Sequence, residues 1–243
     1  MMLNSIDVHC HILPGVDDGS ESMDETMSMI KMAYSEGIRG MIATPHYHYG
    51  YAAQDWEKVY HVWEQVREKV SAELPEMEIY LGREIYSDSR SMDMLAADAG
   101  SGRNTMGSSR YVLIEFTPGA EYREIKNSLS NILSLGYQTI LAHAERCMSI
   151  RKKPELAEEL VQMGNYIQLN AGSIAGSFSD RRFCKKLMSM DCVHFVGTDC
   201  HGSIKRTPQI KKSVEYVIKH FGEEYARQLY WENPEKMLGN EYL

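Results

Sequence analysis

Short runs of apolar, mostly β-branched residues recur along the chain, and longer stretches with apolar residues at helical spacing separate them. The short runs predict seven strands, at residues 6–9, 40–43, 78–81, 111–116, 138–142, 166–169 and 194–198. The longer stretches predict helices at residues 22–37, 55–73, 120–135, 154–163, 180–190 and 208–221. Residues 98–109, rich in Gly and Ser, are expected to form a loop.

The first predicted helix has the clearest boundaries. Ser22 precedes it and Glu25 follows three residues later, which is the pattern of a capping box, and Gly37 suits the position after the last turn. Strands that alternate with helices imply parallel βαβ units, and about seven of them favour a closed or nearly closed barrel. A doubly wound open sheet is the alternative. The length suits one α/β barrel, so residues 1–243 are expected to form a single domain.

Polar side chains that can bind metals follow the predicted strands at their carboxyl ends. In chain order they are His9, His11, His46, Glu84, Glu115, His143, Asp199 and His201. Asp17 and Asp18 lie in the loop after the first strand. The carboxyl ends of the strands meet at one end of a barrel, where barrel enzymes build their active sites, so these side chains are predicted to lie together.

A shared cation explains these residues better than separate structural roles do. A pair such as His9 and His11 is weak evidence alone, and a single acid in an apolar strand is often a hydrogen-bonded structural group. However, burying the charge of Glu115 or Asp199 without a partner is unfavourable in free energy. Several strands also carry such a polar residue at the same end. Imidazole and carboxylate ligands together suit Zn, Mn or Fe. The histidines expected to be structural or surface residues are His61, His194 and His220, and His48 is left open.

Composition and charge narrow the choice of partners and compartment. The formal net charge of −8 disfavours nonspecific binding to nucleic acid or anionic membranes, so an anionic substrate needs local positive charge. No apolar run approaches the roughly 20 residues that span a bilayer, and the first residues lack the features of a signal peptide, which predicts a cytoplasmic protein. Five cysteines at irregular spacing, without a CxxC pair, are expected to be reduced thiols.

Seven short motifs, taken in order, resemble those of one enzyme family: HCH, PGVDDG, ATPH, GREIY, LIEF, LAHAER and GTDCHG. The set is similar to the PHP (polymerase and histidinol phosphatase) superfamily. More narrowly, it resembles the bacterial manganese-dependent protein-tyrosine phosphatases of the CpsB and CapC type. The resemblance extends from Asp7 to about Leu238, where ENPEKML also matches. It implies an α/β fold, a distorted (β/α)7 TIM-like barrel.

The resemblance also implies three divalent metal ions, with manganese as the expected metal and Fe, Zn or Co as alternatives. The ligands of the first ion would be His9, His11, Glu84 and Asp199. Glu84 would bridge to a second ion, whose other ligands would be Glu115 and His143. The ligands of the third would be Asp18, His46 and His201. Asp17 is then left as a supporting or turn residue.

The implied reaction is hydrolysis of phosphotyrosine on a protein, expected to be a bacterial tyrosine kinase that controls capsule or exopolysaccharide synthesis. Metal ions would activate water for direct attack on phosphorus. Arg146 and Arg206 are the candidates for bidentate contacts to the phosphate, and His201 could assist proton transfer to the leaving oxygen. A phenol, with a pKa of about 10, leaves more readily than an alkoxide, so this proton is less critical.

Three alternatives are open at this point. A histidinol phosphatase or another small phosphoester hydrolase would use the same metals. Residues 200–206 read CHGSIKR and Thr207 follows, which matches the C-x5-R-[ST] loop of cysteine-dependent tyrosine phosphatases, with Cys200 as nucleophile and Arg206 on the phosphate. A regulatory module would bind metal through the same ligands without catalysis.

Overall fold

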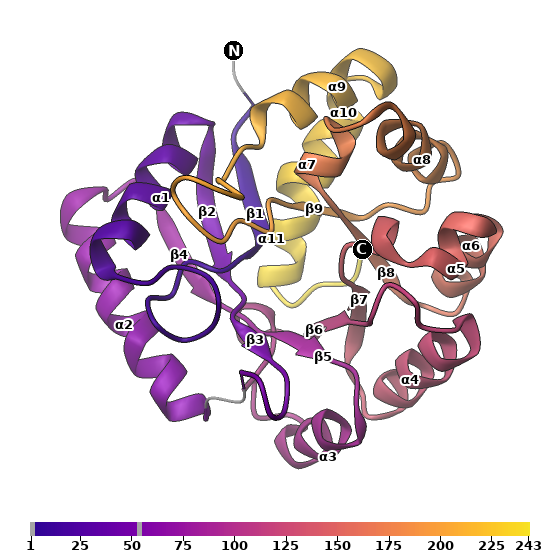
Figure 1. Cartoon of the computed structure of the whole chain (residues 1–243), viewed down its shortest axis with the longest axis horizontal. Helices are drawn as coiled ribbons and strands as arrows, with labels where there is room; N and C mark the ends of the chain where they lie inside the picture. Colours follow the sequence, from indigo (N-terminus) through magenta and orange to yellow (C-terminus); the bar gives the residue numbers. More distant parts are fainter. Residues whose placement is uncertain (1–2, 53–54) are drawn as a thin grey trace.

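The structure, a computed structural model, describes residues 3–52 and 55–243, and its strands form two parallel sheets (Figure 1). The first sheet contains, in order, β1 (Ser5–Cys10), β2 (Ile38–Ala43) and β4 (Glu78–Leu81). The second contains, in order, β3 (His46–Tyr47), β5 (Glu84–Tyr86), β6 (Tyr111–Glu115), β7 (Gln138–Leu141), β8 (Tyr166–Asn170) and β9 (Phe195–Gly197). Every pair of neighbours is parallel, as the alternation of strands and helices predicts.

The two sheets are continuous with each other through two broken strands. The amide of Gly82, after β4, donates a hydrogen bond to the carbonyl of Ala43 at 2.8 Å. The amide of Glu84 donates to the carbonyl of Pro45 at 3.2 Å. β2 and β3 are therefore two halves of one strand position, and so are β4 and β5. The sheet has seven strand positions, the number that the sequence predicts.

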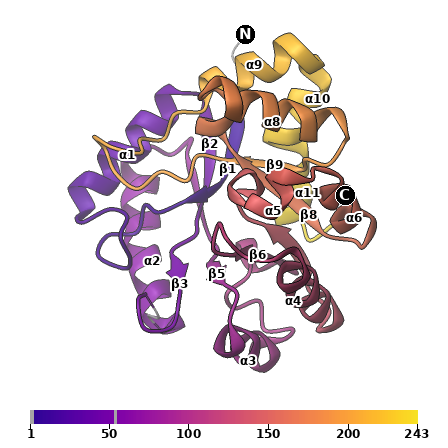
Figure 2. The same cartoon turned by 45° about the vertical axis from the view of Figure 1, so that its right-hand side comes forward.

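The first and last strand positions meet and curl the sheet into a barrel (Figure 2). The amide of Asp199, just after β9, donates to the carbonyl of His9 at 2.7 Å, and the amide of His11 donates to the carbonyl of Cys200 at 2.9 Å. Cys10 and Cys200 form a parallel bridge. The expected (β/α)7 TIM-like barrel is confirmed. The open doubly wound sheet is wrong, because its two edge strands would not contact each other.

Helices surround this barrel (Figure 1). The longer ones are α1 (Met23–Ser35), α2 (Trp56–Glu73), α3 (Ser89–Asp98), α4 (Tyr122–Ser134), α6 (Glu155–Gln162), α8 (Phe178–Ser189) and α9 (Lys211–Phe221). Shorter segments are α5 (Met148–Lys152), α7 (Ala171–Ile174), α10 (Glu223–Arg227), α11 (Asn233–Leu238), the 3-10 turns η1 (Met106–Ser108) and η2 (Ala144–Arg146), and the π-helical η3 (Gln228–Glu232). Within the described ranges, none of the helices combines the length and the apolar character needed to cross a membrane.

The hydrophobic pattern misses α3 and the short strands β3 and β5. Only Ser91 and Leu95 are buried on α3, so the helix lacks the apolar stripe by which a sequence reveals a helix. β3 and β5 are two and three residues long, which is too short for any periodicity to show. The predicted loop at residues 98–109 contains one short turn, η1.

The N-terminal cap of α1 differs in part from the prediction. The Ser22 hydroxyl accepts a hydrogen bond from the Glu25 amide at 3.2 Å, as expected. The Glu25 carboxylate, however, accepts from the amides of Glu21 and Ser203. Glu25 therefore joins α1 to the loop after β9 instead of completing a capping box. Gly37, with φ of +97°, has the left-handed conformation that suits the residue after a helix.

The barrel interior has an apolar layer, and a polar layer follows it at the carboxyl ends of the strands. On β6, Tyr111 and Leu113 belong to an apolar cluster to which β1, β2, β6, β7, β9 and α11 all contribute. Val112 and Ile114 belong instead to the larger cluster that includes the helices. Side chains alternate between the two faces of a strand, so Glu115 falls on the inner face, above Leu113. The strand ends thus present polar groups inside the barrel mouth.

The close contact between β9 and β1 makes Gly197 a test of this closure. A Cβ atom at Gly197 would lie 2.5 Å from His9 Cβ and 3.0 Å from His9 N, so Gly197→Ala must push the two strands apart. We expect a loss of about 1–3 kcal/mol in the free energy of unfolding, measured by urea denaturation. Gly119→Ala, where a Cβ atom meets nothing within 4 Å, is the matched control. Equal midpoints for the two variants would contradict the close packing.

Candidate metal centre

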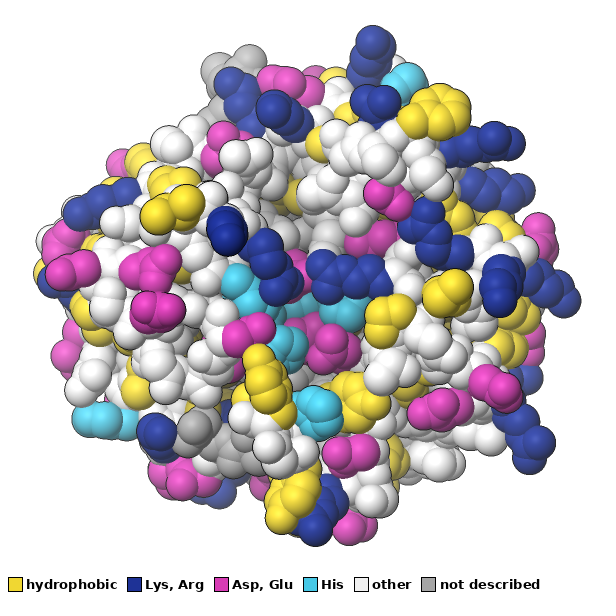
Figure 3. Space-filling view, viewed as in Figure 1, with side chains coloured by type: hydrophobic (Ala, Val, Ile, Leu, Met, Phe, Trp, Pro, Cys, Tyr) yellow, Lys and Arg dark blue, Asp and Glu magenta, His cyan; other side chains and the backbone are white. Residues whose placement is uncertain are grey.

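The nine predicted ligand residues lie together in the barrel mouth, where Figure 3 shows histidine and acidic side chains gathered at the centre of the face. Each imidazole among them lies within 3.7 Å of at least one carboxylate of the group. The members are His9, His11, Asp18, His46, Glu84, Glu115, His143, Asp199 and His201. The first part of the sequence prediction, that strand ends bring these side chains together, therefore matches the geometry.

Glu84, buried at the start of β5, lies at the centre of this group. Its Oε2 atom is 3.1 Å from His9 Nε2, 3.2 Å from His11 Nε2 and 3.0 Å from His46 Nδ1. Its Oε1 atom is 2.8 Å from His143 Nε2. One carboxylate thus faces four imidazoles, which come from two other strand positions and from the loop after β7. The break between β4 and β5 is what places Glu84 inside the barrel mouth.

Two further carboxylates flank Glu84 on different sides. Asp199 Oδ1 lies 3.7 Å from His9 Nε2 and 3.6 Å from His11 Nε2. Glu115 lies on the other side, with Oε2 3.5 Å from His46 Nδ1 and Oε1 3.6 Å from His143 Nε2. The atoms of His9, His11 and Glu84 are close enough to share one ion, and so are those of His46, Glu84 and Glu115.

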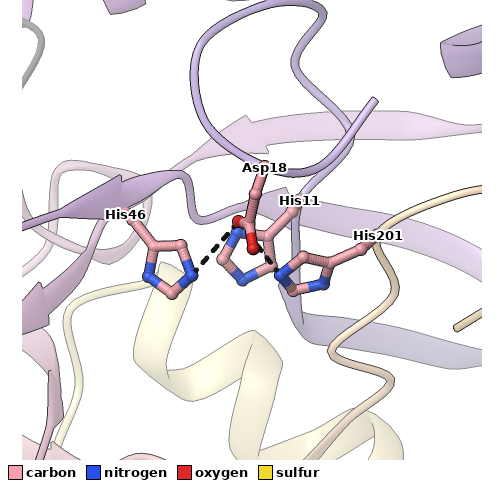
Figure 4. Close-up of side chains that lie close together, drawn as sticks. All are labelled: His11, Asp18, His46 and His201. Atoms are coloured by element: carbon pink, nitrogen blue, oxygen red, sulfur yellow. Dashed lines mark ion pairs between the residues drawn. The ribbon is translucent and has the colours of Figure 1, made fainter. Parts of the chain in front are cut away.

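A third group forms around Asp18 in the loop after β1 (Figure 4). Asp18 Oδ1 lies 3.5 Å from His46 Nε2 and 3.4 Å from His201 Nε2. His11 completes the group, since one donor atom from each of the four residues lies within 4.8 Å of the others. The sequence prediction assigned His11 to a different ion. In the structure, His11 and His46 each lie between two of the groups.

The donor set fits divalent metal ions. Glu84 Oε2 and His201 Nε2 are buried, and neither forms a hydrogen bond within the described residues, although buried polar atoms are normally paired and three imidazole nitrogens face Glu84 Oε2. Imidazole nitrogens and carboxylate oxygens are the ligands of Mn, Fe and catalytic Zn. The thiols nearest to the group, Cys10 and Cys200, are not part of any donor cluster among the described residues. A cation in the barrel mouth would satisfy both unpaired atoms.

The ionisation states of Glu84, Asp199 and His201 also suit metal ligands, whereas at His9 and His11 the nearby carboxylates overcome the effect of burial and raise the pKa, so metal must displace a proton there. Burial alone would raise the pKa of Glu84, but the surrounding histidines, His9 first, hold it well below its usual range. Burial likewise opposes ionisation of Asp199, and the charges of His9 and Arg146 lower its pKa. Burial, reinforced by the neighbouring His11, lowers the pKa of His201 to about 4. Ionised carboxylates and a neutral imidazole are the forms that bind metal, and a neutral His201 favours a ligand over a proton donor.

Asp17 supports the group without belonging to any of the metal clusters. Its Oδ2 atom lies 2.7 Å from His11 Nδ1 and accepts a hydrogen bond from the His46 amide at 2.9 Å, and its Oδ1 atom accepts from the Gly19 amide at 3.0 Å. Burial opposes the charge on Asp17, but the bond with His11 holds its pKa well below the usual range. This contact directs His11 Nε2 toward Glu84, which agrees with the supporting role that the sequence analysis left to Asp17.

Two residues of β8, Gln168 and Asn170, complete the support, and the sequence analysis missed them. Gln168 Oε1 accepts from the His143 amide at 2.7 Å and lies 3.3 Å from His9 Nδ1. Asn170 Nδ2 donates to Asp199 Oδ2 at 2.8 Å, and Gln168 Nε2 donates to Asn170 Oδ1 at 2.9 Å. The signal was present in the sequence, since two amides occupy alternate positions of a strand that is otherwise apolar.

Arg146 and Arg206 both reach the group through Asp199. Arg146 lies 2.5 Å from Asp199 Oδ2 and Arg206 lies 2.7 Å from Asp199 Oδ1. Their side chains are 43% and 45% exposed, so a face of each guanidinium group is open to solvent. Two cations at the edge of the site give this acidic chain the local positive charge that an anionic substrate needs.

The loops that carry these residues have unusual backbone conformations. His143, Asp199 and Arg206 have φ angles of 31°, 53° and 49°, in the left-handed region that residues other than glycine seldom adopt. Three such residues in one site indicate that the backbone is strained at the positions that orient these side chains.

Cys200 is not placed as the nucleophile of a cysteine-dependent phosphatase. It is fully buried, it pairs with Cys10 across the barrel seam, and its carbonyl accepts from the His11 amide. Arg206 contacts Asp199, and its carbonyl accepts from the His201 amide. The C-x5-R reading of this loop is therefore wrong, because the thiol faces the protein interior and not a phosphate cradle.

The remaining histidines lie outside the group, as expected. His61 on α2 contacts Gln65, and His220 on α9 is exposed. His194 is largely buried, which lowers its pKa to about 4, and it contacts the Ile167 amide. His48, left open by the sequence, stacks on Tyr86 with 4.1 Å between ring centroids.

Comparison with known proteins identifies the family. The profile of the family described as capsular polysaccharide synthesis, CpsB/CapC, matches residues 5–239. The chain belongs to the CpsB/CapC family. The tyrosine-protein phosphatase CpsB of Streptococcus pneumoniae is 32% identical to it over 245 residues, covering 98% of this chain and 100% of that protein. The tyrosine-protein phosphatase YwqE of Bacillus subtilis is 31% identical over 246 residues, covering 98% and 93%.

A solved structure also matches this member of the CpsB/CapC family. It comes from the crystal structures of YwqE from Bacillus subtilis and CpsB from Streptococcus pneumoniae, described as metal-dependent tyrosine phosphatases. The TM-score is 0.89 at 30% identity, with 98% of this chain and 96% of the other covered. The family resemblance seen in the motifs is therefore confirmed over nearly the whole chain.

The position of Asp17 leads to a test of metal affinity. Asp17→Asn removes the charge that holds His11 and places an amide nitrogen where an oxygen now accepts hydrogen bonds. We expect Mn²⁺ affinity, measured by calorimetry on metal-free protein, to fall about 10- to 100-fold. Asp93→Asn, on the exposed face of α3, is the control and is expected to bind as the parent does. Unchanged affinity in Asp17→Asn would show that Asp17 only shapes its own loop.

Proposed function

We propose that this chain is a metal-dependent protein-tyrosine phosphatase, a phosphoric monoester hydrolase, and that residues 1–243 form one catalytic domain. The observation that carries the proposal is the buried Glu84 carboxylate with four imidazoles around it. It occurs in a chain that aligns over 98% of its length with a protein named as a tyrosine phosphatase. A buried acid among nitrogen donors suits metal-assisted hydrolysis and has no role in cysteine-based chemistry.

We infer three divalent ions, with manganese as the expected metal. The first is assigned to His9, His11, Glu84 and Asp199, the second to Glu84, Glu115 and His143, and the third to Asp18, His46 and His201. Because His11 and His46 face two groups each, they are the residues through which neighbouring ions would affect one another. When bound, such ions lower the pKa of water and neutralise the charge that develops on phosphoryl oxygens.

The protein's own cations hold the phosphate. Arg146 and Arg206 each use one guanidinium nitrogen on Asp199, and both side chains are partly exposed, which leaves other N–H groups to contact a phosphate. A guanidinium group presents parallel N–H donors that match two oxygens of a phosphate. The two arginines therefore orient the phosphoryl group above the carboxylate cluster.

The leaving group needs little help from the protein. A tyrosine phenol has a pKa of about 10 and departs more readily than a serine alkoxide. His201, whose pKa burial and His11 lower to about 4, is not the imidazolium acid near pH 7 that would donate a proton to a leaving oxygen. The site is thus better suited to aryl phosphates than to alkyl phosphates, which favours phosphotyrosine over histidinol phosphate.

The partner that follows is a phosphotyrosyl protein. The family description, capsular polysaccharide synthesis, favours a bacterial tyrosine kinase that controls capsule or exopolysaccharide production. Such a substrate would be met in the cytoplasm. Neither nucleic acid nor membrane insertion has a place in this proposal, given the net charge of −8.

Chelation tests the proposed chemistry against the cysteine mechanism. We expect EDTA to abolish hydrolysis of a phosphotyrosyl peptide and Mn²⁺ to restore it, because the His and carboxylate cluster supplies the reactive site. Cys200→Ser is expected to keep most of the turnover, since its thiol is buried. Full activity after chelation, or an inactive Cys200→Ser with its metal content intact, would refute the metal mechanism.

The arginines give a separate test of phosphate binding. A charge-assisted contact to phosphate is worth about 1.5–3 kcal/mol, so Arg146→Ala and Arg206→Ala should each lower kcat/KM by about one to two orders of magnitude. Metal content should persist, because Asp199 still accepts a hydrogen bond from Asn170. Lysine should restore activity only in part. Arg181→Ala, exposed on α8, is the control. Parent-like kinetics in both arginine variants would exclude them from substrate binding.

A further inference from the structure

A row of aromatic rings lines one side of the metal cluster. His48 stacks on Tyr86 with ring centroids 4.1 Å apart and an interplanar angle of 24°. Tyr51 follows on the other side of His48, with 6.1 Å between their ring centroids. Tyr51 is exposed, and His48 and Tyr86 are half-buried. The row is therefore a surface of the site and not part of the interior core.

Both ends of this row adjoin proposed metal ligands. The Tyr51 ring lies 6.4 Å from the His46 ring. The Tyr51 hydroxyl also lies near the Asp18 carboxylate. At the other end, Tyr86 pairs with Glu115 in the register of β5 and β6. A molecule bound on the cluster would thus lie against the rings.

The arginines lie across the cluster from these rings. Arg146 and Arg206 approach through Asp199, beside β9, whereas Tyr51 and Tyr86 approach through Asp18 and Glu115. Figure 3 shows dark blue side chains above the central histidines and hydrophobic side chains below them. One side of the site is therefore cationic and suits phosphate, and the opposite side is aromatic and suits an apolar leaving group.

The turn that carries Tyr51 is braced, although its ring is exposed. The His48 amide donates to the Ala52 carbonyl at 3.2 Å, and the Ala52 amide donates to the His48 carbonyl at 2.9 Å. Gly50 has φ of +83°, which permits the tight turn. The Tyr51 residue is nevertheless 63% exposed. A turn held by two backbone hydrogen bonds that presents an exposed ring beside a reactive cluster is suited to bind a ligand.

We propose that Tyr51, with His48 and Tyr86 beside it, forms a subsite for the aromatic ring of an aryl phosphoester. The inference rests on the proposed phosphatase function and specifies which residues recognise the ring of its substrate. Aromatic rings gain from edge-to-face or offset contact with one another, in addition to the apolar area they bury. The subsite thus selects phosphotyrosine by its ring, while the arginines and the metal cluster bind the phosphate.

Binding of two non-hydrolysable ligands tests the subsite without relying on turnover. Phenylphosphonate and methylphosphonate share the anionic group and differ in the ring, and calorimetry on Mn-loaded protein gives both dissociation constants. Tyr51→Ala is expected to weaken phenylphosphonate about tenfold and to change methylphosphonate less than twofold. Tyr51→Phe, which keeps the ring, should bind both as the parent does. On a phosphotyrosyl peptide, Tyr51→Ala should raise KM more than it lowers kcat.

The control for this test is Tyr49→Ala. Tyr49 lies on the same turn and is 51% exposed, but the Arg90 guanidinium covers its ring at 3.3 Å, so it is not offered to the site. Equal weakening of both phosphonates in Tyr51→Ala, at unchanged metal content, would mean that Tyr51 acts on the phosphate site through Asp18. No weakening of phenylphosphonate would also overturn the proposal. Failure of the phosphatase function itself would appear separately, as a metal-loaded parent that cannot hydrolyse the peptide.

Discussion

The buried carboxylate of Glu84 imposes the constraint on which the rest of the barrel mouth depends. An ionised acid in the interior is tolerated only when nearby groups balance its charge, and here four imidazoles do so. Glu84 and His46 each follow a break in their strand position, between β4 and β5 and between β2 and β3. The distortion of the barrel therefore lies at its site. β8 contributes no charged ligand, and its two amides hold the groups that its neighbours supply.

Much of this arrangement could be predicted from the sequence, for one geometric reason. The carboxyl ends of parallel strands meet at one end of a barrel, so a polar residue that follows a strand is placed by its position alone. This reasoning located Glu84, Glu115, His143 and Asp199 without any knowledge of distances. It could not assign His11 or His46 to one group, because each ring has two nitrogens and ring orientation depends on partners such as Asp17.

Other features could not be predicted from the sequence, because the patterns that would reveal them are short and weak. α3 has only two buried residues, and β3 and β5, at two and three residues, are too short for an alternation of apolar and polar residues to be recognised. The capping motif at Ser22 was half correct, since Glu25 has the right spacing but contacts the loop after β9. The C-x5-R motif at Cys200 was misleading, because spacing along a chain does not show which way a thiol points. In the structure Cys200 is fully buried, so its thiol is not exposed to a phosphate.

The seam between the first and last strands has a consequence for how the protein acquires its site during synthesis. Asp7 on β1 accepts hydrogen bonds from Thr198, a residue 191 positions further along the chain. His9 and Asp199 lie beside that contact, with 3.7 Å between His9 Nε2 and Asp199 Oδ1. A ribosome-bound chain that ends before β9 carries most of the donor groups but lacks Asp199 and His201. Contacts of such long sequence separation form late and slowly in folding, so the site should be completed among the last steps of maturation.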